Sequence, residues 1–222
     1  MDDLRDWLAI LESMGALRTI KGLSWDLEIG AAVSPRVLGN EPYAILFDDI
    51  PGYPSGYRVL TGAAKLPRAV ARLLNIPPGD SIPELIQATR ERLPEWEANL
   101  SKFPPRVVKE GPILENVDSG ANIDLFKFPV PKWHEHDGGR YIGTADCVIT
   151  RDPDTGEVNL GTYRIMVHDQ KTTALYISPG KHGRVHYEKY HAPCPERRPR
   201  SFCRACRARG WADAESGWPA WA

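Results

Sequence analysis

Residues 138–183 constrain the fold of this chain more than any other stretch. Strand-like runs cover residues 141–150, 158–168 and 173–178, and the short segments RDPDTGE and HDQKT separate them. Apolar and β-branched runs joined by turns rich in Asp, Pro and Gly are typical of antiparallel hairpins. The stretch therefore predicts a three-stranded antiparallel meander, as part of an antiparallel sheet or a small barrel.

The first hundred residues predict a mixed α/β scaffold without clustered chemistry. Apolar residues recur there at helical spacing, and Ser81 with Glu84 has the spacing of a capping box at a helix start. Short strand-like runs alternate with these helical patterns. We expect helices at 4–14, 25–38, 66–74 and 81–96, and strands at 43–50 and 58–60.

A proline-rich segment, residues 103–137, separates an N-terminal region of alternating helical and strand-like patterns from a strand-rich region. We expect an α+β chain in which a mixed α/β N-terminal domain covers residues 1–115 and a second, strand-rich domain covers 116–192. Residues 193–222 contain no Leu, Ile, Val, Met or Tyr, so they cannot build a core. We interpret them as a disordered tail, translated out of frame from a GC-rich gene.

Composition excludes several classes of function. The chain of 222 residues carries 28 Lys and Arg against 29 Asp and Glu. Its net charge is therefore too small to attract nucleic acid or an anionic membrane to the protein as a whole. No signal peptide and no run of roughly 20 apolar residues is present, so we expect a cytoplasmic protein. The tail holds Cys194, Cys203 and Cys206; a half zinc site and a basic nucleic-acid-binding tail are weaker interpretations of it.

Polar residues of the meander are candidates for a binding site. Asn159 and Arg164 would point to opposite faces of an ideal strand, unless a bulge at Gly161 re-aims one of them. Thr162 shares a face with Arg164. The alternative is an ordinary strand with a solvated Arg164.

The loop SPGKHG, which precedes a helical pattern at 185–190, could bring backbone amides and His182 to an anion or a metal. A surface histidine is the alternative. His134 and His136 have metal-ligand chemistry too, although such pairs are common in polar loops. Cys147 lies in a strand-like run and is expected to be a small core residue.

Several runs of this sequence resemble the UbiD family of prenylated-FMN-dependent decarboxylases. They are DGGRYIGTADCVITRDPDTGEVNLGTYRIMVHDQKT, the later SPGKH, and the N-terminal DLRDWLAILESMGALRTI and FDDIPGYPSGYRVLTG. The resemblance covers residues 2–192. It implies that the second domain is part of a split β-barrel of the flavin-reductase type. It also implies non-oxidative, reversible decarboxylation of an aromatic or α,β-unsaturated carboxylic acid.

The resemblance also implies the roles of individual residues. Asn159 and His182 match two ligands of a divalent metal, Mn²⁺, which bridges to the phosphate of prenylated FMN with K⁺ nearby. Arg164 matches the catalytic arginine that holds the substrate carboxylate, a role that suits a bidentate guanidinium. The residues that match cofactor contacts are Thr144, Gly161, Thr162, Tyr163 and Arg164.

The third metal ligand and both catalytic glutamates of the family have no match in this sequence, so we expect a truncated, inactive form. The implied partners are a flavin prenyltransferase that supplies the cofactor and further copies of the full-length parent. Membrane association is expected only for a polyprenyl substrate. The alternatives are an FMN-dependent reductase on the same barrel, which needs nicotinamide and no metal, and a non-catalytic partner-binding fragment.

Overall fold

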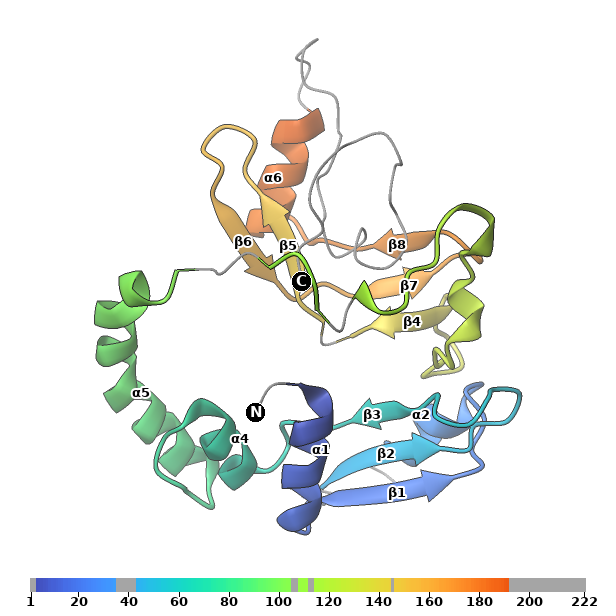
Figure 1. Cartoon of the computed structure of the whole chain (residues 1–222), viewed down its shortest axis with the longest axis horizontal. Helices are drawn as coiled ribbons and strands as arrows, with labels where there is room; N and C mark the ends of the chain where they lie inside the picture. Colours follow the sequence, from blue (N-terminus) through green and yellow to red (C-terminus); the bar gives the residue numbers. More distant parts are fainter. Residues whose placement is uncertain (1–2, 35–42, 105–107, 112–113, 145, 192–222) are drawn as a thin grey trace. The chain divides into compact units, whose positions relative to one another are not determined.

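The computed structural model describes residues 3–34, 43–104, 108–111, 114–144 and 146–191 (Figure 1). The chain divides into two compact units near residue 106, within the proline-rich segment, and residues 133–135 belong to the first unit. The α+β class predicted from the sequence is confirmed. The tail at 193–222, with its three cysteines, lies outside the described residues.

The first unit contains a three-stranded sheet in the order β1-β2-β3. Strand β1 (Leu17–Lys21) runs parallel to β2 (Ala44–Asp48), and β3 (Val59–Thr61) is antiparallel to β2. The described residues of this unit also form the helices α1 (Leu4–Ser13), α2 (Glu28–Ala32), α4 (Pro67–Leu74) and α5 (Ile82–Asn99).

Strand β2 is the centre of the first unit because both of its faces are buried. Ala44 packs with Trp7 and Leu11 of α1 in one apolar cluster. Ile45 and Phe47 belong to a second cluster that includes α2. A strand covered on both faces is a continuous apolar run, and this is why the sequence predicted β2 correctly.

The other predictions for the first unit met mixed results. The capping box is confirmed, because Glu84 N–H donates to Ser81 Oγ at 3.4 Å and Ser81 N–H donates to Glu84 Oε2 at 3.2 Å. The helix expected at 25–38 is described only as the short α2, and its predicted end lies outside the described residues. The sequence missed β1, which is partly exposed along its length and lacks the alternation of apolar residues that marks a strand.

The second unit contains two antiparallel sheets instead of the predicted single meander. Strands β5 (Val148–Arg151) and β6 (Val158–Gly161) form a hairpin. A separate sheet has the order β4-β7-β8, formed by β4 (Arg140–Gly143), β7 (Ile165–Val167) and β8 (Thr173–Leu175). Both long predicted strands are therefore interrupted, and the described strands do not close into a barrel.

Burial explains where the chain breaks between β6 and β7. Tyr163 lies in the interruption and joins Val148, Ile165 and Ile177 in the core of this unit. Cys147 immediately precedes β5 and is exposed, whereas its neighbour Val148 is fully buried. The prediction of a buried Cys147 was wrong because successive side chains at the start of a strand point in opposite directions.

Helix α6 (His182–His191) follows the SPGKHG loop and packs against β5 and β6. It confirms the helix expected at 185–190. Among the helices that the structure describes, none combines the length and apolar character needed to cross a membrane.

We expect Gly30→Ala to destabilise the first unit. A Cβ at Gly30 would lie 2.8 Å from Trp133 Cα and closer still to its carbonyl group, and backbone cannot rotate away. Overpacking of this kind costs about 1–3 kcal/mol, which exceeds the gain in helix propensity of about 1 kcal/mol. Urea unfolding measures the change. Gly138→Ala is the control, since its Cβ would meet only Met166 Sδ at 3.8 Å; equal stability of the two variants would contradict the packing described.

Candidate functional site

One pocket in the second unit gathers most of the residues singled out by the sequence. It has a volume of about 770 Å³, and β6, the following segment, the end of β8 and the start of α6 form its wall. Thr144, at the end of β4, is exposed and is not among the residues that line it. The lining residues are Asn159, Leu160, Gly161, Thr162, Tyr163, Arg164, Tyr176, Ser178, Gly180, Lys181 and His182.

The pocket is suited to an anionic group. Arg164, Lys181 and His182 are exposed and line it, whereas its described lining residues include no carboxylate. The Arg164 guanidinium lies 5.3 Å from the centre of the Tyr176 ring, an arrangement that attracts a cation to the ring face. Phosphate or carboxylate would find two basic side chains and a histidine in one place.

Tyr163 fixes the wall of the pocket from the inside. Its hydroxyl accepts a hydrogen bond from the Gly183 N–H at 3.1 Å, near the start of α6. A Cβ at Gly161 would lie 2.5 Å from Tyr163 Cε2, and one at Gly183 would lie 2.8 Å from the hydroxyl. The ring therefore fills the space between β6 and α6, and only glycine fits on either side of it.

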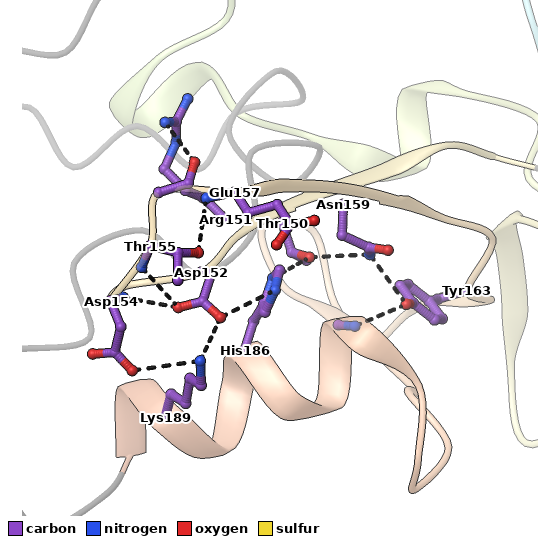
Figure 2. A network of polar contacts seen from close by, with 12 residues as sticks. Thr150, Arg151, Asp152, Asp154, Thr155, Glu157, Asn159, Tyr163, His186 and Lys189 are labelled. Carbon is purple, nitrogen blue, oxygen red and sulfur yellow. Dashed lines mark hydrogen bonds and ion pairs between the residues drawn. The ribbon is translucent and has the colours of Figure 1, made fainter. Parts of the chain in front are cut away.

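Asn159 is oriented by polar groups behind the pocket (Figure 2). It lies opposite Thr150 in the β5–β6 register, and its Nδ2 is 3.2 Å from Thr150 Oγ1 and 3.5 Å from the Tyr163 hydroxyl. Thr150 Oγ1 lies 2.9 Å from Nδ1 of His186 on α6. Thr150 and His186 are both buried, so this contact is shielded from water.

Asp152 forms the far end of the same group of residues. Its Oδ2 lies 3.8 Å from His186 Nε2 and 2.5 Å from Lys189 Nζ. Its Oδ1 accepts the backbone N–H groups of Asp154 and Thr155 at 2.8 and 3.3 Å. The hydrogen bond from Lys189 and these backbone donors lower the pKa of Asp152 to about 2. Asp152 is therefore a carboxylate at neutral pH.

Four residues that lie behind the pocket were not predicted from the sequence: Thr150, Asp152, His186 and Lys189. Thr150 could have been found, because the RDPDTGE turn fixes the hairpin register that places it opposite Asn159. His182, His186 and Lys189 recur at positions i, i+4 and i+7 of α6, a spacing that puts them along one face of a helix. Asp152 gave no such signal, because an aspartate in a turn has a local structural role in most proteins.

The pocket has donors that fit a hard divalent cation shared with a phosphate. Asn159 and His182 line the same wall, and their side chains carry an amide oxygen and an imidazole. Carbonyl and phosphate oxygens suit Mn²⁺, and imidazole is a common metal ligand. Within the described part of the chain no cluster of three His, Cys, Asp or Glu exists, so His134 and His136 form no such group.

Tyr163→Phe is expected to destabilise the second unit by about 1–3 kcal/mol, because it leaves the buried Gly183 N–H without its acceptor. Urea unfolding followed by circular dichroism measures the loss. Tyr176→Phe removes the same hydroxyl from an exposed ring and should change stability little. A Tyr163→Phe variant as stable as Tyr176→Phe would contradict this role.

Lys189→Met is expected to raise the pKa of Asp152 from about 2 toward the ordinary aspartate value of 3.8, since the hydrogen bond from Lys189 is the largest cause of the lowered pKa. The lowered pKa of Asp152 adds stability to the folded state. This contribution is fully present above pH 3.8, the pKa of an unfolded aspartate, and is lost as the pH falls through the lower folded pKa. Because the folded pKa is higher in the variant, its contribution should be smaller and should be lost at a higher pH than in the parent. Carboxyl ¹³C chemical shifts measured across pH 1.5–6 report the pKa. Asp169, whose pKa is lowered by its own turn, is an internal control that should not move.

Two family models match the chain. Residues 8–89 match the N-terminal domain of 3-octaprenyl-4-hydroxybenzoate carboxy-lyase, UbiD_N, and residues 106–203 match its Rift-related domain, UbiD. A pyrrole-2-carboxylic acid decarboxylase of Pseudomonas aeruginosa is 34% identical over 164 residues, which cover 71% of this chain and 32% of that protein.

Solved structures resemble the same region. The closed form of vanillic acid decarboxylase from Sedimentibacter hydroxybenzoicus has a TM-score of 0.69 and 32% identity, covering 86% of this chain and 40% of that one. An evolved dimeric form of the UbiD-class enzyme HmfF from Pelotomaculum thermopropionicum, in complex with prFMN, has a TM-score of 0.68 and 29% identity, covering 86% and 41%. The chain spans about 40% of the length of such relatives. With both domain models matched in order along the sequence, the chain belongs to the UbiD family.

Proposed function

We propose that this chain forms the cofactor-binding part of a decarboxylase that acts reversibly and without oxidation on an aromatic or α,β-unsaturated carboxylic acid. The observation that carries the proposal is the single pocket that gathers Asn159, Arg164 and His182. Relatives named for the decarboxylation of pyrrole-2-carboxylic and phenolic acids support the reaction class. The structure of HmfF with prFMN supports the cofactor.

The residues that would hold the cofactor lie along one wall of the pocket. The Asn159 carbonyl and the His182 imidazole would bind Mn²⁺, which would neutralise the phosphate of prenylated FMN, with K⁺ nearby. Gly161, Thr162 and Tyr163, which line the same pocket, would lie along the flavin. Bound prenylated FMN supplies an acceptor for the electron pair that remains when carbon dioxide leaves.

Arg164 would bind the carboxylate of the substrate. Its guanidinium is exposed at the pocket and lies 5.3 Å from the centre of the Tyr176 ring. A planar guanidinium binds a carboxylate through two parallel hydrogen bonds and so orients the bond that breaks. The glutamates implied by the family resemblance have no counterpart among the matched residues, so binding is the first property to test.

The proposal extends to the surroundings of the site. The β5–β6 hairpin and the β4-β7-β8 sheet would form part of a split β-barrel of the flavin-reductase type. A flavin prenyltransferase would supply the cofactor. Further copies of the chain's parent protein would form a homo-oligomer.

We expect the purified chain to retain prenylated FMN in the presence of Mn²⁺. Asn159→Ala and His182→Ala should each weaken retention by more than about 10-fold, since each removes a metal ligand. Flavin absorbance after gel filtration and Mn²⁺ content by atomic absorption measure the two components. His168→Ala, which changes an exposed histidine outside the pocket, is the matched control.

Three results would count against the proposal. Flavin retention that needs no metal, accompanied by oxidation of a nicotinamide, would indicate an FMN-dependent reductase. Absence of flavin together with capture of a protein partner would indicate a binding fragment. Equal retention by His182→Ala and His168→Ala would remove His182 from the metal site.

In the flavin-loaded chain, Arg164→Lys is expected to weaken the binding of aromatic carboxylates about 10-fold or more, because an ammonium group cannot form the bidentate contact. Quenching of flavin fluorescence by vanillate or pyrrole-2-carboxylate measures this affinity. Unchanged affinity would show that Arg164 does not hold the carboxylate.

A further inference from the structure

We propose that Asp152, His186 and Thr150 together fix which atom of the Asn159 amide faces the pocket, through the Asp152 carboxylate charge beside the His186 ring and the hydrogen bonds that run from His186 through Thr150 to Asn159. They would act as positioning residues for a cation ligand. The inference rests on the proposed function, in which Asn159 acts through its carbonyl oxygen.

An asparagine side chain can present either of two opposite chemistries. Its Oδ1 accepts a hydrogen bond or binds a cation, and its Nδ2 only donates. The two ends have nearly the same shape, so the groups behind the side chain decide which end faces forward. In Asn159 the Nδ2 group lies 3.2 Å from Thr150 Oγ1 and 3.5 Å from the Tyr163 hydroxyl (Figure 2). Asn159 lines the pocket, and the carbonyl oxygen is the end of its amide that these contacts do not use.

Thr150 links this orientation to helix α6. Its hydroxyl has one hydrogen to donate, and only 1% of the residue is exposed, so water cannot replace a missing partner. When Oγ1 accepts from Asn159 Nδ2, its hydrogen is available for His186 Nδ1 at 2.9 Å. If His186 Nδ1 were also a donor to Oγ1, the buried Thr150 hydrogen would need a third partner, and the described contacts of Oγ1 are only those with Asn159 and His186, so the Asn159 orientation favours an Nδ1 that accepts.

The tautomer of His186 is set at the other side of its ring. Nε2 faces Asp152 Oδ2 at 3.8 Å, which is too long for a hydrogen bond but close enough for the carboxylate charge to favour an N–H there. Both side chains are less than a tenth exposed. Lys189 Nζ also contacts Oδ2, at 2.5 Å, and offsets part of the carboxylate charge. The oxygen that faces Nε2 can only accept, so it still favours an N–H over a ring lone pair there.

The polarity then runs one way through the whole chain of residues. His186 Nε2–H points to Asp152, Thr150 O–H to His186 Nδ1, and Asn159 N–H to Thr150 Oγ1. The reverse polarity would place a proton on His186 Nδ1, turn the Thr150 hydrogen toward Asn159, and rotate the amide so that its NH₂ group faced the pocket. An NH₂ group cannot bind Mn²⁺.

The first experiment reads the polarity directly in the chain without metal or flavin. Long-range ¹H–¹⁵N spectra distinguish the two imidazole tautomers. We expect His186 to be protonated at Nε2 in the parent chain, and the population protonated at Nδ1 to increase in Asp152→Asn. A parent chain protonated mainly at Nδ1 would overturn the inference whether or not the chain binds a cofactor.

The second experiment measures the effect on the ligand. Thr150→Val keeps the shape and removes the hydroxyl, and it should weaken Mn²⁺ binding about 10- to 100-fold, the range found for groups that orient metal ligands. Thr150→Ser keeps the hydroxyl and should restore affinity to within a few-fold of the parent. Free Mn²⁺ is quantified by electron paramagnetic resonance in the presence of FMN, and circular dichroism confirms folding.

These outcomes separate the two proposals. If the parent chain binds no Mn²⁺, or if Asn159→Ala binds it as well as the parent does, the metal site has failed and the tautomer of His186 alone decides the polarity. If Asn159→Ala weakens binding while Thr150→Val and Thr150→Ser both bind as the parent does, the metal site stands and the positioning role is overturned.

Discussion

The burial of Tyr163 between two glycines is the contact on which the second unit depends. The ring lies between Gly161 of β6 and Gly183 of α6, and its hydroxyl accepts a hydrogen bond from the Gly183 N–H. To reach this position the chain leaves the β5–β6 hairpin after Gly161 and enters the β4-β7-β8 sheet at Ile165. The segment 162–164 between the two strands lines the pocket. The contact that completes the core therefore also places Thr162 and Arg164 at the site.

Polar chemistry is divided between two sides of the β5–β6 hairpin. Basic and neutral groups line the pocket, whereas the carboxylate of Asp152 lies behind it, paired with Lys189. This separation keeps a negative charge away from the place where a phosphate or carboxylate would bind. The same carboxylate oxygen that pairs with Lys189 also faces His186 Nε2, and the proposed effect on the Asn159 amide passes from there through Thr150.

The sequence predicted the parts of the fold in which local signals and tertiary structure agree. Strand β2 is a continuous apolar run because it is buried on both faces, and helix α5 begins at a capping box that needs no tertiary contact. Strand β1 was missed because only its pairing with β2 makes it a strand. The break at Tyr163 was also missed, since the run from Val158 to His168 has the composition of one strand.

The candidate site shows the same division. Residue type and family resemblance selected Asn159, Arg164 and His182, and the structure places all three around one pocket. The groups that orient Asn159 come from the opposite strand and from α6, so no short sequence window contains them.

The most direct test of the central claim is a crystal structure of the chain with Mn²⁺ and prenylated FMN, recorded at the manganese absorption edge. We predict an anomalous peak at a manganese ion bound by the Asn159 carbonyl oxygen, His182 and the phosphate of the flavin. A manganese ion held elsewhere, or a flavin bound away from this pocket, would contradict it.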